Sequence, residues 1–208
     1  MNTEFMAPRP YSMEKRRAAN DETRARILEA ARQLLCSEPK TDLSMEAIAR
    51  SADVSRLTIY YQFSSRAGLL EALYDHLAGR GNMHRMAEVF QEKNPSVALD
   101  KMVGTFVGFW ASDPVVMRRL RAMADLDPEI GQGIQARDAR RPQIVLEILS
   151  RAKPRKTKQP SLKQRVAADV LAMLTSFEAY DALSRAGHSE EQIVSTLTGL
   201  ARCVIPLS

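Results

Sequence analysis

The chain is short of cysteine and of long apolar runs, and each shortage excludes a class of protein. Its two cysteines, Cys36 and Cys203, lie far apart without metal-ligand spacing, so we expect free thiols in a reduced, cytoplasmic protein. The longest strongly apolar run, Met102 to Ala111, is too short to cross a bilayer. Residues 1–17 have no apolar core flanked by basic residues, so no signal peptide is expected. We therefore expect no membrane partner.

Motifs for catalysis and for cofactor binding are also missing. The sequence has no Glu-x-x-His pair for a di-iron bundle, no glycine loop for a phosphate and no nucleophile motif. Three scattered histidines could meet a carboxylate, although a satisfied surface or core histidine is far commoner than a site. These are His76, His84 and His188, with Asp125, Glu178 and Asp181 as possible partners or as groups that fix a polar ligand. We expect no enzyme, no metal and no cofactor.

The positive charge of the chain is not placed where a nucleic-acid interface would use it. The net charge is +5, but residues 1–78 hold eleven Lys/Arg and eleven Asp/Glu. The surplus matches one cluster in a stretch with two prolines: Arg151, Lys153, Arg155, Lys156 and Lys158. Such a run is usually a solvated loop. Net charge alone therefore gives no argument for DNA binding.

Helical periodicity dominates the N-terminal part. Residues 1–19 are polar and basic, and we expect a disordered arm. Asn20 or Asp21 can cap a first helix that Pro39 ends. Further helices are expected from Ser44, from Ser55 and from Ser64-Ser65.

The rest of the chain is also predicted to be helical, and no segment alternates as a strand does. A buried helix should run from Pro95-Ser96 through Trp110, and Asp113-Pro114 and Asp127-Pro128 should each open another. Pro142 should kink or divide residues 129–152. One long helix is expected from Ser161 to Ala186, with Gly187 as its stop, and Ser189 to Gln192 have capping-box spacing for the last helix. The fold class predicted is all-α.

Residues 43–66 have the makings of a helix-turn-helix, whose second helix enters the major groove of DNA. In the helix after Ser55, we expect Leu57 and Ile59 to anchor it while polar side chains remain outside. Arginine and glutamine can bind bases or phosphates, tyrosine and threonine hydroxyls can bind phosphates, and helix N-termini attract phosphate. The candidate DNA-binding residues are Ser44, Ser55, Arg56, Thr58, Tyr60, Tyr61, Gln62, Ser65 and Arg66. Taken alone, the segment could also be a helical hairpin in a bundle.

The order of motifs resembles the N-terminal domain of the tetracycline-repressor (TetR) family. The resemblance covers about residues 22–78 and rests on Ile27-Leu28-x-Ala30-Ala31, Ser44-x-x-x-Ile48-Ala49, Val54-Ser55-x-x-Thr58-Ile59-Tyr60-x-x-Phe63 and Arg66-x-x-Leu69-Leu70. It implies a homodimeric repressor of about nine helices, with a DNA-binding domain at 20–78 and a ligand-binding and dimerisation domain at 79–208. Asp53 stands where the family usually has glycine, and aspartate tolerates left-handed backbone. Arg66 stands where the family often has lysine and keeps the charge.

The C-terminal part predicts a cavity and a dimer surface. A methionine- and aromatic-rich set suits a small, largely apolar effector, although such stripes are more often plain core. Its members are Met102, Phe106, Phe109, Trp110, Met117, Leu120, Met123, Met173, Phe177 and Tyr180. The wide apolar arcs of the last two helices predict a two-fold, four-helix interface through Val166, Val170, Leu174, Ile193, Leu197, Leu200 and Val204. A two-fold dimer suits a palindromic operator of double-stranded DNA.

Two other functions remain open from the sequence. A helical small-molecule carrier or an enzyme could retain a vestigial DNA-binding head. A DNA-bound regulator could also work without a small-molecule effector, or as an activator. Salt-dependent binding to DNA would separate the first of these from a regulator.

Overall fold

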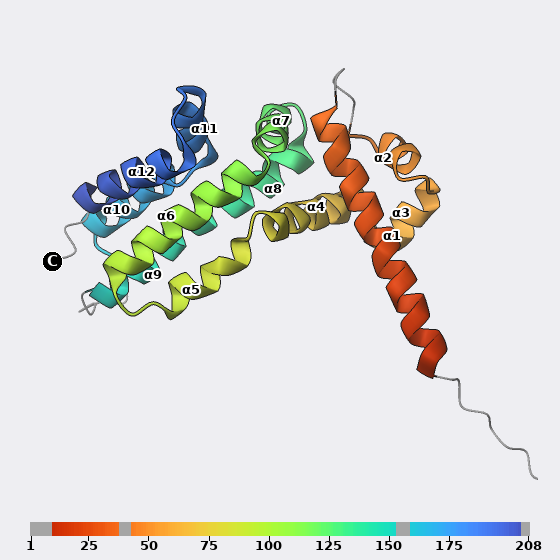
Figure 1. Ribbon diagram of the computed structural model, residues 1–208, viewed down its shortest axis with the longest axis horizontal. Coiled ribbons are helices and arrows are strands. Elements are labelled where there is room, and N and C mark those ends of the chain that lie inside the picture. Colours follow the sequence, from red (N-terminus) through yellow and green to blue (C-terminus); the bar gives the residue numbers. More distant parts are fainter. Residues whose placement is uncertain (1–9, 38–42, 153–158, 205–208) are drawn as a thin grey trace, which may run out of the picture. The chain divides into compact units, whose positions relative to one another are not determined.

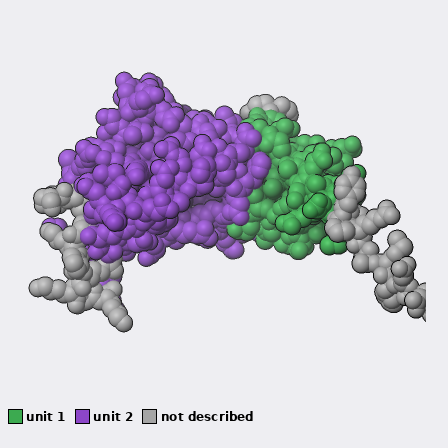
Figure 2. Space-filling view, turned by 60° about the horizontal axis from the view of Figure 1, so that its bottom comes forward, with its two compact units in different colours: residues 1–73 green, residues 74–208 purple. Residues whose placement is uncertain are grey.

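The computed structural model describes residues 10–37, 43–152 and 159–204 (Figure 1). In these ranges it contains twelve α-helices, one short 3-10 helix and no strand, which confirms the all-α prediction. The chain divides into two compact units, residues 1–73 and 74–208 (Figure 2). The division falls inside α4 (Arg66–Arg80) rather than after residue 78, where we expected it. No helix in the described ranges is long and apolar enough to span a bilayer.

The first unit is built from α1 (Pro10–Cys36), α2 (Met45–Ser51), α3 (Arg56–Phe63) and the first part of α4. α2 packs against both α1 and α3. Apolar side chains from all four helices are buried, and they meet the helical spacing predicted from the sequence: Ile27, Ala31, Leu35, Ile48, Ile59, Leu69 and Leu73. The core thus holds the two short helices against the long first one.

The first helix begins earlier than predicted. α1 starts at Pro10, so residues 10–19 are helical and not part of a disordered arm, and residues 1–9 lie outside the described residues. Asn20 lies within the helix, and its side-chain oxygen accepts a hydrogen bond from Gln62, so it does not act as the cap. The early start fits the Glu-Lys-Arg-Arg-Ala-Ala run from Glu14, because these residue types favour helix without needing a core.

The second unit contains the short 3-10 helix η1 (Met83–Arg85) and eight further helices. These are α5 (Met86–Gln91), α6 (Pro95–Ser112), α7 (Pro114–Ala124), α8 (Pro128–Asp138), α9 (Arg140–Ala152), α10 (Leu162–Leu174), α11 (Phe177–Arg185) and α12 (Glu190–Val204). α6 packs against α5, α9 and α12, and α7 packs against α8. The proline starts of α6, α7 and α8 are confirmed, and Pro142 lies in the first turn of α9, so the predicted division occurs.

The long helix predicted from Ser161 to Ala186 is broken into α10 and α11. At the break, the Thr175 hydroxyl donates to the Leu171 carbonyl oxygen at 2.9 Å, and Ser176 caps α11 by accepting from the Ala179 backbone N–H at 3.2 Å. The Thr175 carbonyl oxygen accepts a hydrogen bond at 3.0 Å from the indole N–H of Trp110 on α6. A side chain from another helix therefore satisfies the backbone carbonyl at the end of α10. The apolar periodicity of the segment itself could not predict this contact.

Several smaller predictions fall on the ends of these elements. Gly187 has φ +90° and follows α11, and Ser189 and Gln192 exchange capping-box hydrogen bonds before α12, as predicted. Arg151 belongs to α9, where it donates to the carbonyl oxygens of Val89 and Glu92, rather than to a solvated loop. The rest of the basic cluster, residues 153–158, lies outside the described residues.

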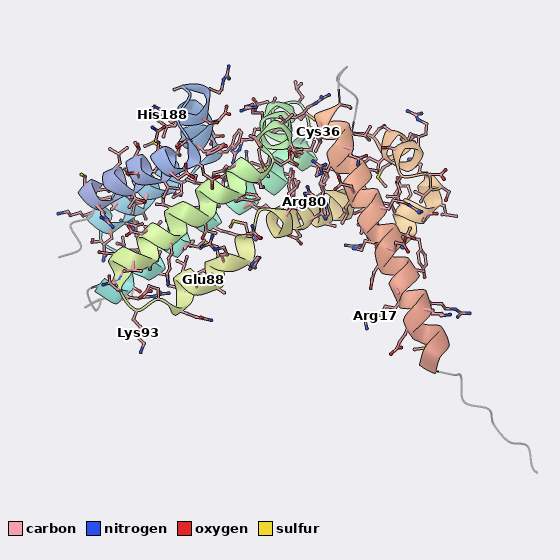
Figure 3. The ribbon with its side chains drawn as sticks, viewed as in Figure 1. Arg17, Cys36, Arg80, Glu88, Lys93 and His188 are labelled. Atoms are coloured by element: carbon pink, nitrogen blue, oxygen red, sulfur yellow. The ribbon has the colours of Figure 1, made fainter. Side chains whose placement is uncertain are left out.

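Both cysteines are free, as predicted, and both are exposed. Cys36 is the last residue of α1 and is labelled in Figure 3. Cys203 lies near the end of α12. Each unit thus carries one accessible thiol.

Candidate nucleic-acid interface and ligand cavity

α2 and α3 form a helix-turn-helix whose caps are those predicted. Ser44 accepts a hydrogen bond from the Ala47 backbone N–H at 3.3 Å, and Ser55 accepts one from the Thr58 backbone N–H at 3.0 Å. Between them, Asp53 takes φ 50°, which is the left-handed turn expected at this position. The turn is therefore built without glycine.

The anchors of α3 are Ile59 and Phe63, and the prediction for Leu57 was wrong. Ile59 and Phe63, four residues apart, are buried, whereas the Leu57 side chain is 78 % exposed. Successive helical residues are about 100° apart, so Leu57 and Ile59 point about 200° away from each other and cannot both anchor the helix. Leu57 instead shares the outer face with Tyr61, which is 82 % exposed. The outer face thus offers an apolar pair suited to a thymine methyl or a sugar.

Arg56 lies on the same exposed helix but is already engaged. Its guanidinium forms an ion pair with Glu46 on α2 and donates to the Tyr60 hydroxyl at 3.2 Å. The Tyr60 hydrogen bond, with Glu46 as the second cause, raises the pKa of Arg56 above its ordinary value. The positive charge of Arg56 is therefore held at the N-terminal end of α3. Glu46 competes with any DNA phosphate or base for this guanidinium.

Two residues predicted to contact DNA make hydrogen bonds within the first unit. Gln62 is half-buried, and its side-chain amide already donates to Asn20 on α1. Thr58 is half-buried as well, and its hydroxyl shares a 2.8 Å hydrogen bond with the Ser55 hydroxyl. Arg24 of α1 donates to the Gln62 carbonyl oxygen at 2.8 Å, and its guanidinium lies over the Phe63 ring. These contacts fix the orientation of α3 against α1.

The start of α4 provides the second predicted helix N-terminus. Ser65 is exposed and accepts a hydrogen bond from the Gly68 backbone N–H at 3.0 Å. A Cβ at Gly68 would lie 2.2 Å from the Phe63 carbonyl oxygen, so the tight approach of α4 to the end of α3 requires glycine. Arg66 is half-buried beside this N-terminus.

The second unit contains a partly open cavity of about 210 Å³. Five of the predicted ligand-binding residues line it: Phe106, Phe109, Trp110, Met117 and Leu120. The other five do not line it: Met102 and Tyr180 are buried elsewhere, Met123 is half-buried, Phe177 packs edge-on against Trp110 from outside the wall, and Met173 is 60 % exposed. The apolar lining also includes Tyr74, Leu77 and Ala78 of α4, with Met83, Ile134 and Ile144.

The charged part of the cavity lining was not predicted. Arg121 donates to both oxygens of Asp138, at 3.1 and 3.2 Å, and Arg141 donates to Asp138 at 2.7 Å. Arg137 donates to Asp75 at 3.0 Å and lies over the Tyr74 ring. These arginines stand on α7, α8 and α9, and in sequence they look like ordinary solvated positions. Only their packing around the aromatic wall reveals a site.

The predicted dimer residues are spread over the surface and the core of the second unit. Val166 and Leu200 are exposed, Val170, Leu174 and Val204 are half-buried, and Ile193 and Leu197 are buried in the unit's own core. Leu162 and Met173 are also exposed on α10. Ile193 and Leu197 are therefore covered within the unit, whereas the other five predicted residues remain at least partly exposed.

In the described ranges, the carboxylates suggested as histidine partners are paired with arginines or exposed. Glu178 pairs with Arg121 and Asp181 with Arg118, while Asp125 is exposed. His188 is exposed in the turn before α12 (Figure 3), and His84 is exposed in η1. No group of three metal-ligating side chains occurs among the described residues.

Comparisons with known proteins agree with this geometry. Residues 27–73 match the family model described as bacterial regulatory proteins, tetR family. The chain is 30 % identical over 105 residues to the nucleoid occlusion factor SlmA of a Marinomonas species, covering 50 % of this chain and 53 % of the relative. It is 30 % identical over 123 residues to the HTH-type transcriptional regulator AlkX of Mycobacterium tuberculosis, covering 57 % and 54 %. The chain thus spans about half the length of these curated relatives.

Solved structures extend the likeness beyond the helix-turn-helix. A Rhodococcus protein assigned to the TetR family superposes with a TM-score of 0.68 at 20 % identity, over 88 % of this chain and 98 % of that one. The TetR-like regulator LfrR of Mycobacterium smegmatis, solved in complex with proflavine, gives 0.54 at 25 % identity, over 90 % and 98 %. The fold of the described chain is therefore that of these proteins. The helix-turn-helix of this chain is therefore that of the tetR family of bacterial regulatory proteins.

Proposed function

We propose that this protein is a ligand-responsive transcriptional regulator that binds a palindromic operator in double-stranded DNA as a homodimer. The observation that carries the proposal is the outer face of α3, where Arg56, Leu57, Tyr60 and Tyr61 are all exposed on a capped helix-turn-helix. A helix of this size presents side chains to base edges in the major groove. Repression in the cytoplasm, with release from the operator by a small molecule, is the mode of action that we infer.

The dimer is supported by the exposed apolar side chains of α10 and α12. Leu162, Val166 and Met173 on α10 and Leu200 on α12 are each about half exposed or more. Contiguous apolar surface of this kind marks interaction sites in soluble proteins. Because α10 and α12 pack side by side, two copies can bury these side chains in a four-helix interface.

The proposed release mechanism uses α4. Tyr74, Asp75 and Leu77 in the second part of α4 line the cavity, while Arg66 to Leu73 belong to the helix-turn-helix unit. A ligand that binds one position of α4 more tightly than another shifts the population between them. The two α3 helices of a dimer must stand about 34 Å apart to fit successive major grooves, so a shift weakens operator binding. The proflavine complex of LfrR supports a small-molecule effector in this fold.

A gel-shift titration on the DNA flanking this gene tests the proposal. Arg56→Ala should weaken operator binding, because it removes the fork that can bind guanine or phosphate. Arg66→Ala should weaken all sequences alike and reduce the salt slope by about one unit, as expected for a phosphate contact. Arg185→Ala removes the same charge from an exposed position on α11 and serves as the control.

Three results separate the alternatives. Absence of salt-dependent DNA binding by the wild type would contradict the proposal and favour a carrier or an enzyme. DNA binding that is unchanged in Arg56→Ala would remove this residue from the interface. Operator binding that no small molecule alters would leave a regulator without an effector.

A further inference from the structure

The cavity of the second unit carries more positive charge than its own carboxylates balance. Its lining includes four arginines and two aspartates: Arg121, Arg137, Arg140, Arg141, Asp75 and Asp138. Four positive and two negative charges leave an excess of two, and counting Glu178, which binds Arg121 from outside the lining, still leaves one. Arg140 is exposed, so water solvates its charge, whereas Arg141 is buried.

Arg141 is an arginine of the cavity that lacks a full set of hydrogen-bond partners. Its residue is only 7 % exposed, and within the described residues its Nε–H is buried without a hydrogen-bond partner. Its Nη1 donates to Asp138, but the same carboxylate also takes two hydrogen bonds from Arg121. One carboxylate thus serves two guanidinium groups. Leaving a buried, charged donor unpaired is costly, and an incoming anion would relieve that cost.

Aromatic rings also line the cavity, next to the arginines. Phe106, Phe109 and Trp110 all line the cavity, and the Phe106 and Phe109 rings lie 6.3 and 4.5 Å from the Trp110 ring, centroid to centroid. The Arg141 guanidinium lies over the Phe106 ring at 5.9 Å, so the charged and aromatic walls meet. A cavity of about 150 Å³ holds benzene, so 210 Å³ suits a molecule of roughly eight or nine non-hydrogen atoms.

We propose that the effector is a small aromatic carboxylate, an inference that rests on the proposed function of this cavity. The ring lies against Phe106, Phe109 and Trp110, and a turn of the Arg141 guanidinium presents its unpaired Nε–H to the carboxylate. Guanidinium and carboxylate match as a bidentate pair, which an amide or an ammonium cannot reproduce. The effector is therefore an anion, in place of the largely apolar molecule expected from the sequence.

An isosteric series tests the charge directly. Benzoate, benzamide and benzamidine have the same shape and carry a negative, zero and positive charge. Trp110 is the single tryptophan of the chain and lines the cavity, so its fluorescence reports binding to the full-length protein. Benzoate should bind about tenfold or more tightly than benzamide, the factor expected for a charge-assisted hydrogen bond, and benzamidine should bind most weakly.

A variant pair assigns the effect to Arg141. Arg141→Gln should lose about tenfold or more in benzoate affinity and leave benzamide affinity unchanged. Arg118→Gln, which removes an arginine paired with Asp181 outside the cavity lining, should leave both unchanged. The ligand series on the wild type keeps the proposal testable if Arg141→Gln does not fold.

The outcomes separate this inference from the proposed function. Equal or tighter binding of benzamide or benzamidine, no benzoate binding, or benzoate binding that Arg141→Gln does not weaken would each overturn it. If ligand-free protein binds operator but not benzoate, the effector class is wrong and the regulator stands. If benzoate binds with the predicted preference but no DNA is bound, the anion site stands and the regulatory function fails.

Discussion

Replacing Gly133 by alanine should destabilise the second unit through Tyr74. Gly133 lies in α8 against the ring of Tyr74, which is buried on the wall of the cavity. An added Cβ would lie 2.5 Å from Tyr74 Cε2, whereas ordinary contacts lie at 3.4–4 Å. The ring cannot swing away freely, because its hydroxyl donates to the Ile130 carbonyl oxygen at 3.0 Å and Arg137 lies over its face at 4.4 Å.

The magnitude follows from three opposing terms. Overpacking a buried contact costs about 1–3 kcal/mol, and losing the Tyr74 hydrogen bond costs about 1 kcal/mol more. The better helix propensity of alanine returns about 1 kcal/mol. The net loss is therefore about 1–3 kcal/mol in the free energy of unfolding, which for a chain of this size lowers Tm by about 2–12 °C.

Thermal and urea unfolding of Gly133→Ala, Tyr74→Phe and the double variant form the assay. Tyr74→Phe removes the hydroxyl that holds the ring, so the double variant should be less destabilised than the sum of the singles, by about 0.5–1.5 kcal/mol. Gly79→Ala is the matched control, since a Cβ there meets no atom within 4 Å and should be neutral or stabilising. A Gly133→Ala variant as stable as wild type, or strictly additive effects, would refute the reasoning.

Two further predictions concern the DNA-binding face and the dimer. Glu46→Gln should raise operator affinity by up to about fivefold, the range for an exposed ion pair, because it releases Arg56 and removes a negative charge from the interface. Glu22→Gln changes an exposed carboxylate on α1 and should leave operator affinity unchanged. An unchanged or lower affinity for Glu46→Gln in the gel shift would contradict the competition between Glu46 and DNA for Arg56. In analytical ultracentrifugation the wild type should sediment as a dimer at micromolar concentration and Val166→Glu as a monomer, because burying an unpaired carboxylate at an interface is unfavourable. Val115→Glu changes an equally exposed valine on α7 and should remain dimeric, so a monomeric wild type or equal dissociation of both variants would count against the proposed interface.

Features governed by local chemistry could be predicted from the sequence. Ser44 and Ser55 cap their helices through their own backbone neighbours, and the prolines that open α6, α7 and α8 act within one turn. The left-handed turn at Asp53 also depends on its own backbone. These signals need no knowledge of the tertiary structure, and they were sufficient to predict the helix-turn-helix.

Features governed by contacts between distant residues could not be predicted. The break between α10 and α11 depends on the indole N–H of Trp110 reaching the Thr175 carbonyl oxygen, 65 residues later. The charged wall of the cavity depends on Arg121 and Arg141 converging on Asp138 from three helices. The outward position of Leu57 is different, since the angle of about 200° between Leu57 and Ile59 was enough to exclude it as an anchor.

The two exposed thiols give the protein its own labelling positions. Cys36 closes α1 in the helix-turn-helix unit, and Cys203 lies near the end of α12 in the other unit. A nitroxide attached to each thiol needs no engineered cysteine, and either one can be silenced by a single serine substitution. In a dimer, the distance between the two Cys36 labels follows the separation of the DNA-binding heads directly. Pulsed electron paramagnetic resonance with and without benzoate can then measure the conformational change that a gel shift registers only as lost affinity.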